Sequence, residues 1–199
     1  MLGQRITIVT RIFEDPTKRE FEQSGLIGVG DARALAVLES RFKSIRFGDY
    51  EIRYAHQVPG ELLNSSNLIC VGGPDANSIT RDALNRLDVS TYTPRSPHDP
   101  RPSFRMRGEG FDYCTLGFVS NPYSNEHDKK WLLFLFGHTS GYGTWAAAEA
   151  VTTKAVRMRK MGPGGFSAFL RTEVVRERPQ QVRLLDFRPI NVISRAEPG

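Results

Sequence analysis

The sequence is poor in the features that define several large protein classes. It holds two cysteines in 199 residues, Cys70 and Cys114, and they form no C-x-x-C pair. Each lies within an apolar run, which predicts two buried thiols rather than a disulfide or a zinc site. We therefore expect no metal site, and we expect the cytoplasm as the compartment.

Long apolar runs are absent as well. The longest run, Trp131–Phe136, falls far short of the roughly 20 apolar residues that a membrane-spanning helix needs. Residues 1–5 lead directly into a strand-like run, without the charged start and apolar stretch of a secretory signal. The sequence thus predicts neither a membrane partner nor export.

Three common enzyme motifs are incomplete or missing. The chain has no G-x-x-x-x-G-K-[ST] motif, which excludes a P-loop ATPase, and the glycines of 25–30 stand in the wrong order for G-x-G-x-x-G. Residues 137–141 approach the G-x-S-x-G elbow of α/β-hydrolases, but Thr139 replaces the serine and no histidine follows it. The esterase interpretation is therefore excluded.

The net charge of +5 raises the question of a nucleic-acid partner. The basic residues are mostly arginine and are scattered, and the cluster Arg157, Arg159 and Lys160 falls at the end of a predicted helix, where cations meet the helix dipole favourably. No recognition helix or aromatic–basic ladder occurs. The sequence disfavours nucleic acid and is compatible with an anionic small molecule.

Strand-like runs alternate with helical patterns along the chain. The predicted strands are 6–9, 51–55, 68–71, 104–107, 112–119, 131–136, 166–177 and 182–187, and the predicted helices are 31–42, 75–87 and 145–160. This order predicts one α/β domain over residues 1–199, a Rossmann-like three-layer domain with a mostly parallel central sheet and an antiparallel C-terminal edge. A loop insertion at about 90–103, rich in Pro, Ser and Asp, is a candidate lid.

Two predicted strands run into glycine-rich turns that open a helix, Gly72–Asn77 and Gly137–Thr144. Glycine lets a backbone approach a phosphate closely, and a helix N-terminus offers free N–H groups and the positive end of a dipole. Ligands of open α/β sheets bind at the carboxyl ends of the strands. The pair of turns predicts a site for a nucleotide-type or other phosphate-bearing anion, although glycines also shape turns that bind nothing.

The candidate site residues come from these turns and from the end of a later strand. The ligand-binding candidates are Gly72, Gly73, Asn77, Asn121, His138, Gly141, Tyr142, Gly143 and Thr144, and the catalytic candidates are His138, Asp75 and Glu149.

Simpler structural roles compete with several of these functions. Asp75 is expected to cap its helix, which makes Asn77 the better ligand candidate. His138 is either a proton-transfer group or an exposed loop residue. Tyr142 either covers a ligand or packs at the turn, and Asn121, which precedes a proline, also suits a plain turn.

Part of the second turn, Gly141-Tyr142-Gly143-Thr144, resembles the P-G-G-x-G-T-x-x-E motif of lysine-decarboxylase-like nucleoside-monophosphate phosphoribohydrolases. The resemblance implies that these residues wrap a phosphate. Ala147 stands where that family carries its catalytic glutamate, and Glu149 points elsewhere around the helix. The resemblance therefore supports phosphate binding more than glycosidic cleavage.

A broader series of motifs runs through the chain, with G-V-G-D-A at 28–32, G-G-P-D-A-N at 72–77, S-N-P-Y at 120–123 and G-Y-G-T at 141–144. This series is similar to the G-G-P-x-A-N and N-P-[FY] pattern of prokaryotic Rossmann-like domains of the archaeal S-layer type. Bacterial relatives of those domains are sometimes attached to signalling modules. The resemblance implies the fold more directly than any activity.

Three functions follow as hypotheses from the residues. The first is a ligand-binding or sensor module for a nucleotide-type anion, and the second is a hydrolase or transferase acting on a nucleotide derivative. The third is a structural or assembly module without a small-molecule ligand. The lack of a complete catalytic set favours the binding or sensor module. The sequence does not identify a cofactor, and it leaves open both a homo-oligomer and a fusion to another module.

Overall fold

The computed structural model describes residues 5–10, 27–87, 104–105, 109–125, 129–138, 140–153 and 165–190. The candidate lid at about 90–103 and residues 154–160 of the predicted helix 145–160 lie outside these ranges.

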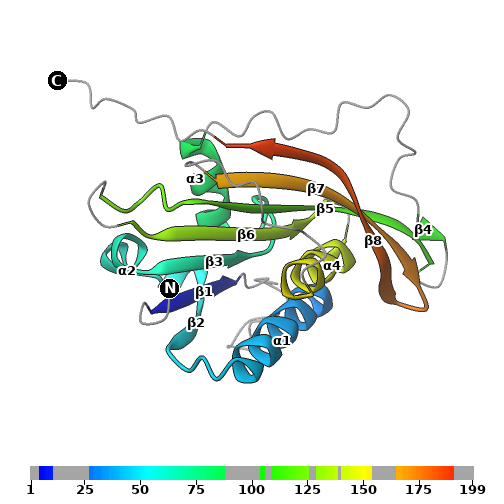
Figure 1. Cartoon of the computed structure of the whole chain (residues 1–199), viewed down its shortest axis with the longest axis horizontal. Helices are drawn as coiled ribbons and strands as arrows, with labels where there is room; N and C mark the ends of the chain where they lie inside the picture. The colour runs from blue at the N-terminus through cyan, green and yellow to red at the C-terminus, as the bar shows by residue number, and fades with distance from the viewer. Residues whose placement is uncertain are drawn as a thin grey trace, which may run out of the picture.

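The described strands form one mixed sheet, whose order is β2-β1-β3-β6-β5-β7-β8, with β4 paired to β5 (Figure 1). The strands are β1 (Ile6–Thr10), β2 (Tyr50–Tyr54), β3 (Asn67–Val71), β4 (Phe104–Arg105), β5 (Glu109–Ser120), β6 (Trp131–Gly137), β7 (Gly165–Val175) and β8 (Arg178–Pro189). All eight correspond to strands that the sequence predicts, with ends shifted by one to a few residues.

The helices alternate with the first strands of the sheet. They are α1 (Val29–Ser44), the short 3-10 helix η1 (Ala55–Gln57), α2 (Gly60–Ser65), α3 (Ser78–Arg86) and α4 (Gly141–Thr152). The sequence did not predict η1 and α2, because elements this short show no helical periodicity.

The α/β class is confirmed, but the antiparallel part of the sheet is larger than expected. Strands β2, β1, β3 and β6 run parallel, whereas β5, β7 and β8 form antiparallel ladders beside them. The short connection from β5 to β6 explains this difference, because a parallel pair needs a crossover of a dozen or more residues. Antiparallel pairing thus begins in the middle of the sheet rather than at its C-terminal edge.

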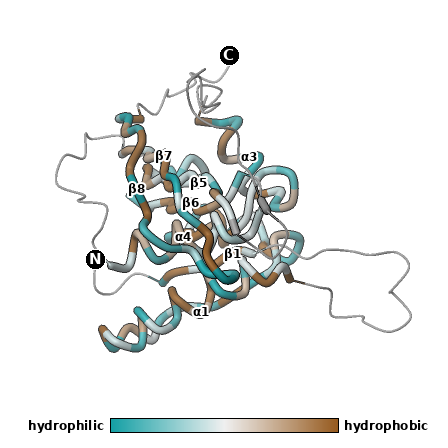
Figure 2. Tube along the Cα trace, turned by 90° about the vertical axis from the view of Figure 1, so that its right-hand side faces the viewer, coloured by the Kyte–Doolittle hydropathy of each residue, from teal (hydrophilic) through white to brown (hydrophobic). Residues whose placement is uncertain are grey.

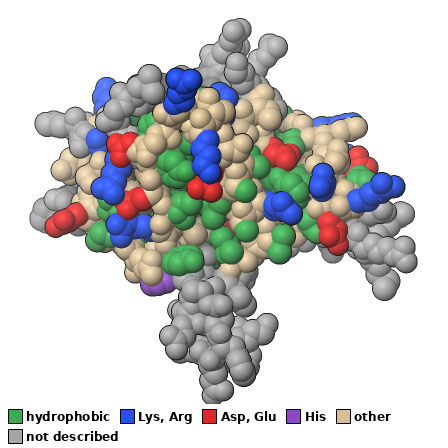
Figure 3. Space-filling view, turned by 90° about the horizontal axis from the view of Figure 1, so that it is seen from below, with side chains coloured by type: hydrophobic (Ala, Val, Ile, Leu, Met, Phe, Trp, Pro, Cys, Tyr) green, Lys and Arg blue, Asp and Glu red, His purple; other side chains and the backbone are tan. Residues whose placement is uncertain are grey.

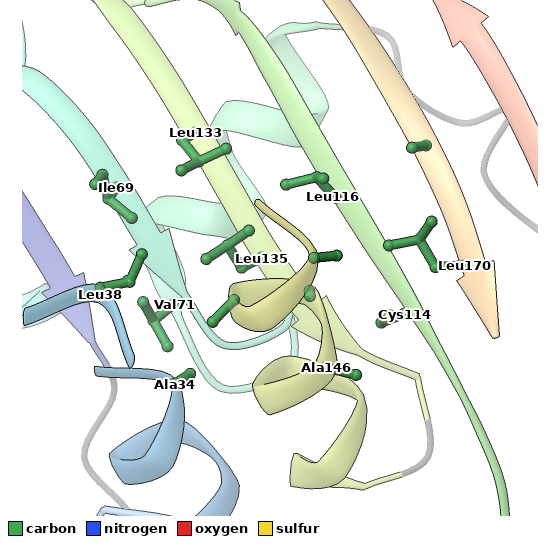
Figure 4. Packing of buried hydrophobic residues seen from close by; sticks show 14 of the residues in the cluster. Ala34, Leu38, Ile69, Val71, Cys114, Leu116, Leu133, Leu135, Ala146 and Leu170 are labelled. Atoms are coloured by element: carbon green, nitrogen blue, oxygen red, sulfur yellow. The ribbon is translucent and has the colours of Figure 1, made fainter. Parts of the chain in front are cut away.

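Helices α1 and α4 lie side by side on one face of the sheet (Figure 4). Ala34 and Leu38 of α1 and Ala146 of α4 pack onto the strand residues Val71 and Leu135. Ala146, Ala147, Ala148 and Ala150 are all buried, so α4 lies close to the strands, as its small side chains predict. Hydrophobic and hydrophilic residues alternate along α1 (Figure 2), and the apolar residues Ala34, Leu38 and Phe42 are the buried ones.

The opposite face of the sheet is covered by α3. Its residues Ile79 and Ala83 pack with Val9, Cys70 and Phe134, which alternate along the strands with the residues that face α1 and α4. Both faces of β6 are therefore buried, as the apolar run predicts. The expected buried thiols are confirmed too, and burial raises the pKa of Cys70 to about 12.

Helices α1 and α4 begin in direct backbone contact. A Cβ atom on Gly30 would overlap the backbone of Gly141, and a Cβ on Gly141 would lie 2.9 Å from the Cα of Gly30. Only glycine at both positions lets the two helix starts meet in this way. The contact places both N-termini at the edge of the sheet where β1, β3 and β6 end.

We expect Gly30→Ala to destabilise the fold by at least about 1–3 kcal/mol, the usual cost of overpacking, because backbone atoms have little room to move. Gly48→Ala is the matched control, since a Cβ at that position meets no atom within 4 Å. Urea unfolding measures both variants. Equal stability of the two variants would contradict the contact.

Candidate functional site

The carboxyl ends of β1, β3 and β6 form the expected binding edge. The two glycine turns follow neighbouring strands, and the N–H of Gly72 donates to the carbonyl oxygen of Leu135 on β6 at 2.9 Å. The two turns therefore lie at one edge of the sheet. Whether a turn can bind a ligand depends on which of its backbone and side-chain polar groups are not already hydrogen-bonded within the protein.

In the first turn, Asn77 is the N-cap of α3. Its side-chain oxygen accepts from the N–H groups of Ile79 and Thr80, and its amide nitrogen donates to the carbonyl oxygens of Val9 and Val71. The side chain is fully buried, and these four bonds use its whole hydrogen-bonding capacity. Asn77 thus ties β1, β3 and α3 together and has nothing left for a ligand.

The expected cap, Asp75, is an exposed residue of the preceding turn, so that prediction is wrong. Gly72 has φ 103°, a value that glycine adopts without strain, and this conformation lets the chain turn sharply out of β3. Gly73 is half-buried against the Phe136 side chain. The glycines of this turn shape the chain for the Asn77 cap.

In the second turn, a carboxylate of the protein itself occupies the start of α4. Oδ2 of Asp112 accepts from the Ser140 hydroxyl at 2.6 Å and from the Gly143 N–H at 2.7 Å, while Oδ1 accepts from the N–H of Tyr113 at 2.8 Å. Asp112 is fully buried. This carboxylate lies at the positive end of the α4 dipole. The sequence predicts a phosphate at the same position.

The packing of this turn also leaves no space for a phosphate group. A Cβ on Gly143 would lie 2.6 Å from both the Cα of Gly137 and the carbonyl oxygen of Tyr113. The Thr144 hydroxyl accepts from the N–H of Gly137 at 3.0 Å, and both Gly143 and Thr144 are buried. These two residues therefore hold β6 against α4.

Tyr142 and Gly141 are the half-buried residues of the same turn. The N–H of Tyr142 donates to Oγ of Ser140, the N-cap of α4, at 3.2 Å. Gly141 contacts Gly30 of α1. Both residues therefore lie near the contact between the N-termini of α1 and α4.

Asn121 lies at the opposite end of the sheet. Its amide nitrogen donates to the carbonyl oxygens of Leu63 and Ser66, just before β3 begins, and its side-chain oxygen accepts from the N–H of Tyr123. Five residues of β3 separate this position from Gly72, a span of about 16 Å. Asn121 is thus not part of the same site as the glycine turns.

His138 follows β6 on the face that α3 covers. Its Nε2 lies 2.7 Å from the hydroxyl of Thr115, and its ring contacts Phe136 and Phe169. The residue is exposed overall, yet burial of part of its ring lowers the pKa of His138 from its usual 6.5. A neutral imidazole is suited to accept a proton, but the Thr115 hydroxyl is fully buried and out of a substrate's reach.

The three catalytic candidates do not converge on one point. Glu149 lies about 12 Å along α4 from Gly141, on the face opposite His138, where desolvation raises its pKa. Asp75 is exposed beyond the first turn. The described residues therefore provide no shared acid–base arrangement built from these three side chains.

The start of α1 differs from those of α3 and α4, because Gly28 occupies its N-cap position and no side chain of the described residues caps the helix. Thr10 ends β1 at the same edge and is 1% exposed, and its hydroxyl has no hydrogen-bond partner. Its side chain projects from the same face of β1 as Ile8, which packs against Ala34. Gly30 lies one turn before Ala34, so we expect the Thr10 side chain to face the first part of α1.

Sequence reasoning missed both Thr10 and Asp112. Thr10 is the last residue of β1, but Thr7 of the same strand is also a buried threonine, so the sequence distinguishes Thr10 only by its place at the strand end. Asp112 lies within a long strand and is far from α4 in sequence, so no local pattern connects it with Gly143.

No protein-family model, curated protein or solved structure matches the chain. The two resemblances noted from the motifs stay predictions. Among the described residues, no group of His, Cys, Asp and Glu side chains is suited to hold a metal ion. None of the described helices combines the length and the apolar content needed to cross a membrane.

We expect Asp112→Asn to destabilise the protein by about 2–3 kcal/mol, because an amide presents one acceptor and one donor to three donors. Asp82→Asn, which alters an exposed i, i+4 pair with Arg86, is the control and is expected to change stability by less than about 0.5 kcal/mol. Unfolding in urea separates the two. An unchanged stability of Asp112→Asn would show that the carboxylate does not hold α4.

Proposed function

We propose that the protein is a binding or sensor module for a phosphate-bearing small molecule, and that the phosphate binds at the start of α1. The observations that carry this proposal are the buried, unpartnered hydroxyl of Thr10 and the N-terminus of α1, at which no described side chain forms a cap. The two features belong to the end of β1 and to the start of the helix that follows it. A phosphate oxygen supplies what the first-turn N–H groups and the hydroxyl lack.

The proposal moves the ligand away from the residues that the sequence favoured. Asn77 caps α3 and Asp112 fills the end of α4, whereas α1 begins at Val29 and Gly30 without a side-chain cap. Glycine at position 30 admits the backbone of Gly141, and the neighbouring Val29 is exposed. Gly141 and Tyr142 border the proposed site, because Gly141 contacts Gly30.

Asp31 limits the charge of the ligand. Its carboxylate is buried in the first turn of α1 and opposes further negative charge nearby. A single phosphate group is therefore favoured over a polyphosphate chain. Figure 3 shows one face of the molecule on which Lys and Arg side chains are spread among acidic and apolar ones, which likewise supports local recognition rather than attraction by a broad basic patch.

A Rossmann-like three-layer classification is part of the same proposal. It is supported by the parallel strands β2, β1, β3 and β6 and by helices packed on both faces. The enzyme hypothesis lacks comparable support, because His138, Asp75 and Glu149 lie apart. The structural-module hypothesis remains as the outcome in which no phosphate compound binds.

Thr10→Val tests the proposal. Replacing an unpartnered buried hydroxyl by a methyl group is expected to stabilise the unliganded protein by about 1 kcal/mol. The same change is expected to weaken binding of inorganic phosphate and nucleoside monophosphates about 10- to 100-fold, because a hydrogen bond to a charged group is lost. Thermal unfolding with and without each compound measures both effects.

Thr80→Val is the matched control. The Thr80 hydroxyl is also buried, but it donates to the carbonyl oxygen of Gly72 at 3.0 Å. This variant is expected to lose about 1 kcal/mol of stability and to bind phosphate compounds with unchanged affinity. If Thr10→Val bound as tightly as the wild type, the phosphate would not lie at α1.

A further inference from the structure

We infer that the ligand is a nucleoside monophosphate whose base lies on Tyr54, at the end of β2. This inference rests on the proposed function, since it extends the phosphate site at α1 by one strand. It adds a ring-binding position that involves neither glycine turn.

The strand register places Tyr54 next to the phosphate site. Thr10 and Tyr54 are partners in the parallel pair of β1 and β2, which separates their backbones by about 4.8 Å. Partner residues of a parallel pair project from the same face. Tyr50, four residues earlier on β2, contacts the Phe42 ring of α1, with centroids 5.0 Å apart, so Tyr54 projects from the α1 face.

Tyr54 belongs to a pair of aligned rings at this edge. The rings of Tyr54 and His56 are parallel within 2°, with centroids 6.1 Å apart. Tyr54 is half-buried and therefore held in place, and His56 is exposed. An aromatic face at a binding edge stacks on any nucleobase, a contact that is worth about 1–3 kcal/mol per base.

The chemistry of the two positions together defines the ligand class. The position between Thr10 and α1 takes one phosphate, since Asp31 opposes a longer anionic chain. The position on the neighbouring strand takes a planar ring. A nucleoside monophosphate carries these two groups with a single sugar between them, which suits adjacent strands.

The test compares AMP with ribose 5-phosphate, which has the same sugar phosphate without a base. Isothermal titration of the wild type is expected to give an affinity about tenfold higher for AMP. Tyr54→Leu is expected to remove this preference and to leave the affinity for ribose 5-phosphate unchanged. Tyr54→Phe keeps the ring and is expected to keep the preference, while Thr10→Val weakens binding of both compounds.

The outcomes separate this inference from the proposed function. Equal affinity of the wild type for the two compounds would overturn the ring position and leave the phosphate site intact. A preference for AMP that persists in Tyr54→Leu would also overturn it. Failure of both compounds to bind the wild type would overturn the phosphate site and the ring position together.

Discussion

The contact between Gly30 and Gly141 brings two helix N-termini to one point, and the other features of this edge depend on it. Each helix start carries roughly half a positive charge, so two starts in contact repel each other unless negative groups lie beside them. Asp112 supplies a buried carboxylate at α4, and Asp31 supplies another in the first turn of α1. The two glycines thus allow the contact, and the two carboxylates offset the positive ends of the two helix dipoles.

The three helix starts at this edge differ in the protein groups that satisfy them. The starts of α3 and α4 are satisfied by Asn77 and by Asp112 with Ser140, which come from the protein itself. The described residues provide no side-chain cap at the start of α1, and the buried Thr10 hydroxyl at the end of β1 has no hydrogen-bond partner. A buried donor without an acceptor costs stability, and this cost is the reason to propose that a ligand binds at this edge.

The sequence predicts the elements of this fold better than the roles of its residues. The apolar runs before Gly72 and Gly137 correctly predict two central, neighbouring strands, because burial on both faces selects continuous apolar residues. The start of α4 was placed four residues too late, since Gly141 and Gly143 are poor helix formers that tertiary contacts nevertheless hold in a helix.

The phosphate site that the sequence predicts at the glycine turns stays a prediction, and the structure shows which protein groups lie there. A glycine-rich turn before a helix indicates close backbone approach, but it does not show what approaches. At Gly143 the approaching groups are the backbone of Gly137 and Tyr113 and the carboxylate of Asp112, which lies 31 positions earlier in the chain. Long-range pairing of this kind follows from strand register, which a single sequence does not define. Thr10 lies outside both glycine-rich turns, so the glycine pattern gives no indication of it.

The central claim is that an anion binds at the start of α1 and not at α4. The most direct measurement is a titration of the isotopically labelled protein with inorganic phosphate, followed through its backbone amide NMR signals. The account predicts that the amides of Val29 and Gly30 shift in a saturable manner, while the amide of Gly143, already bonded to Asp112, stays in place. Saturable shifts centred on Gly143 and Thr144, or none at Val29 and Gly30, would contradict it.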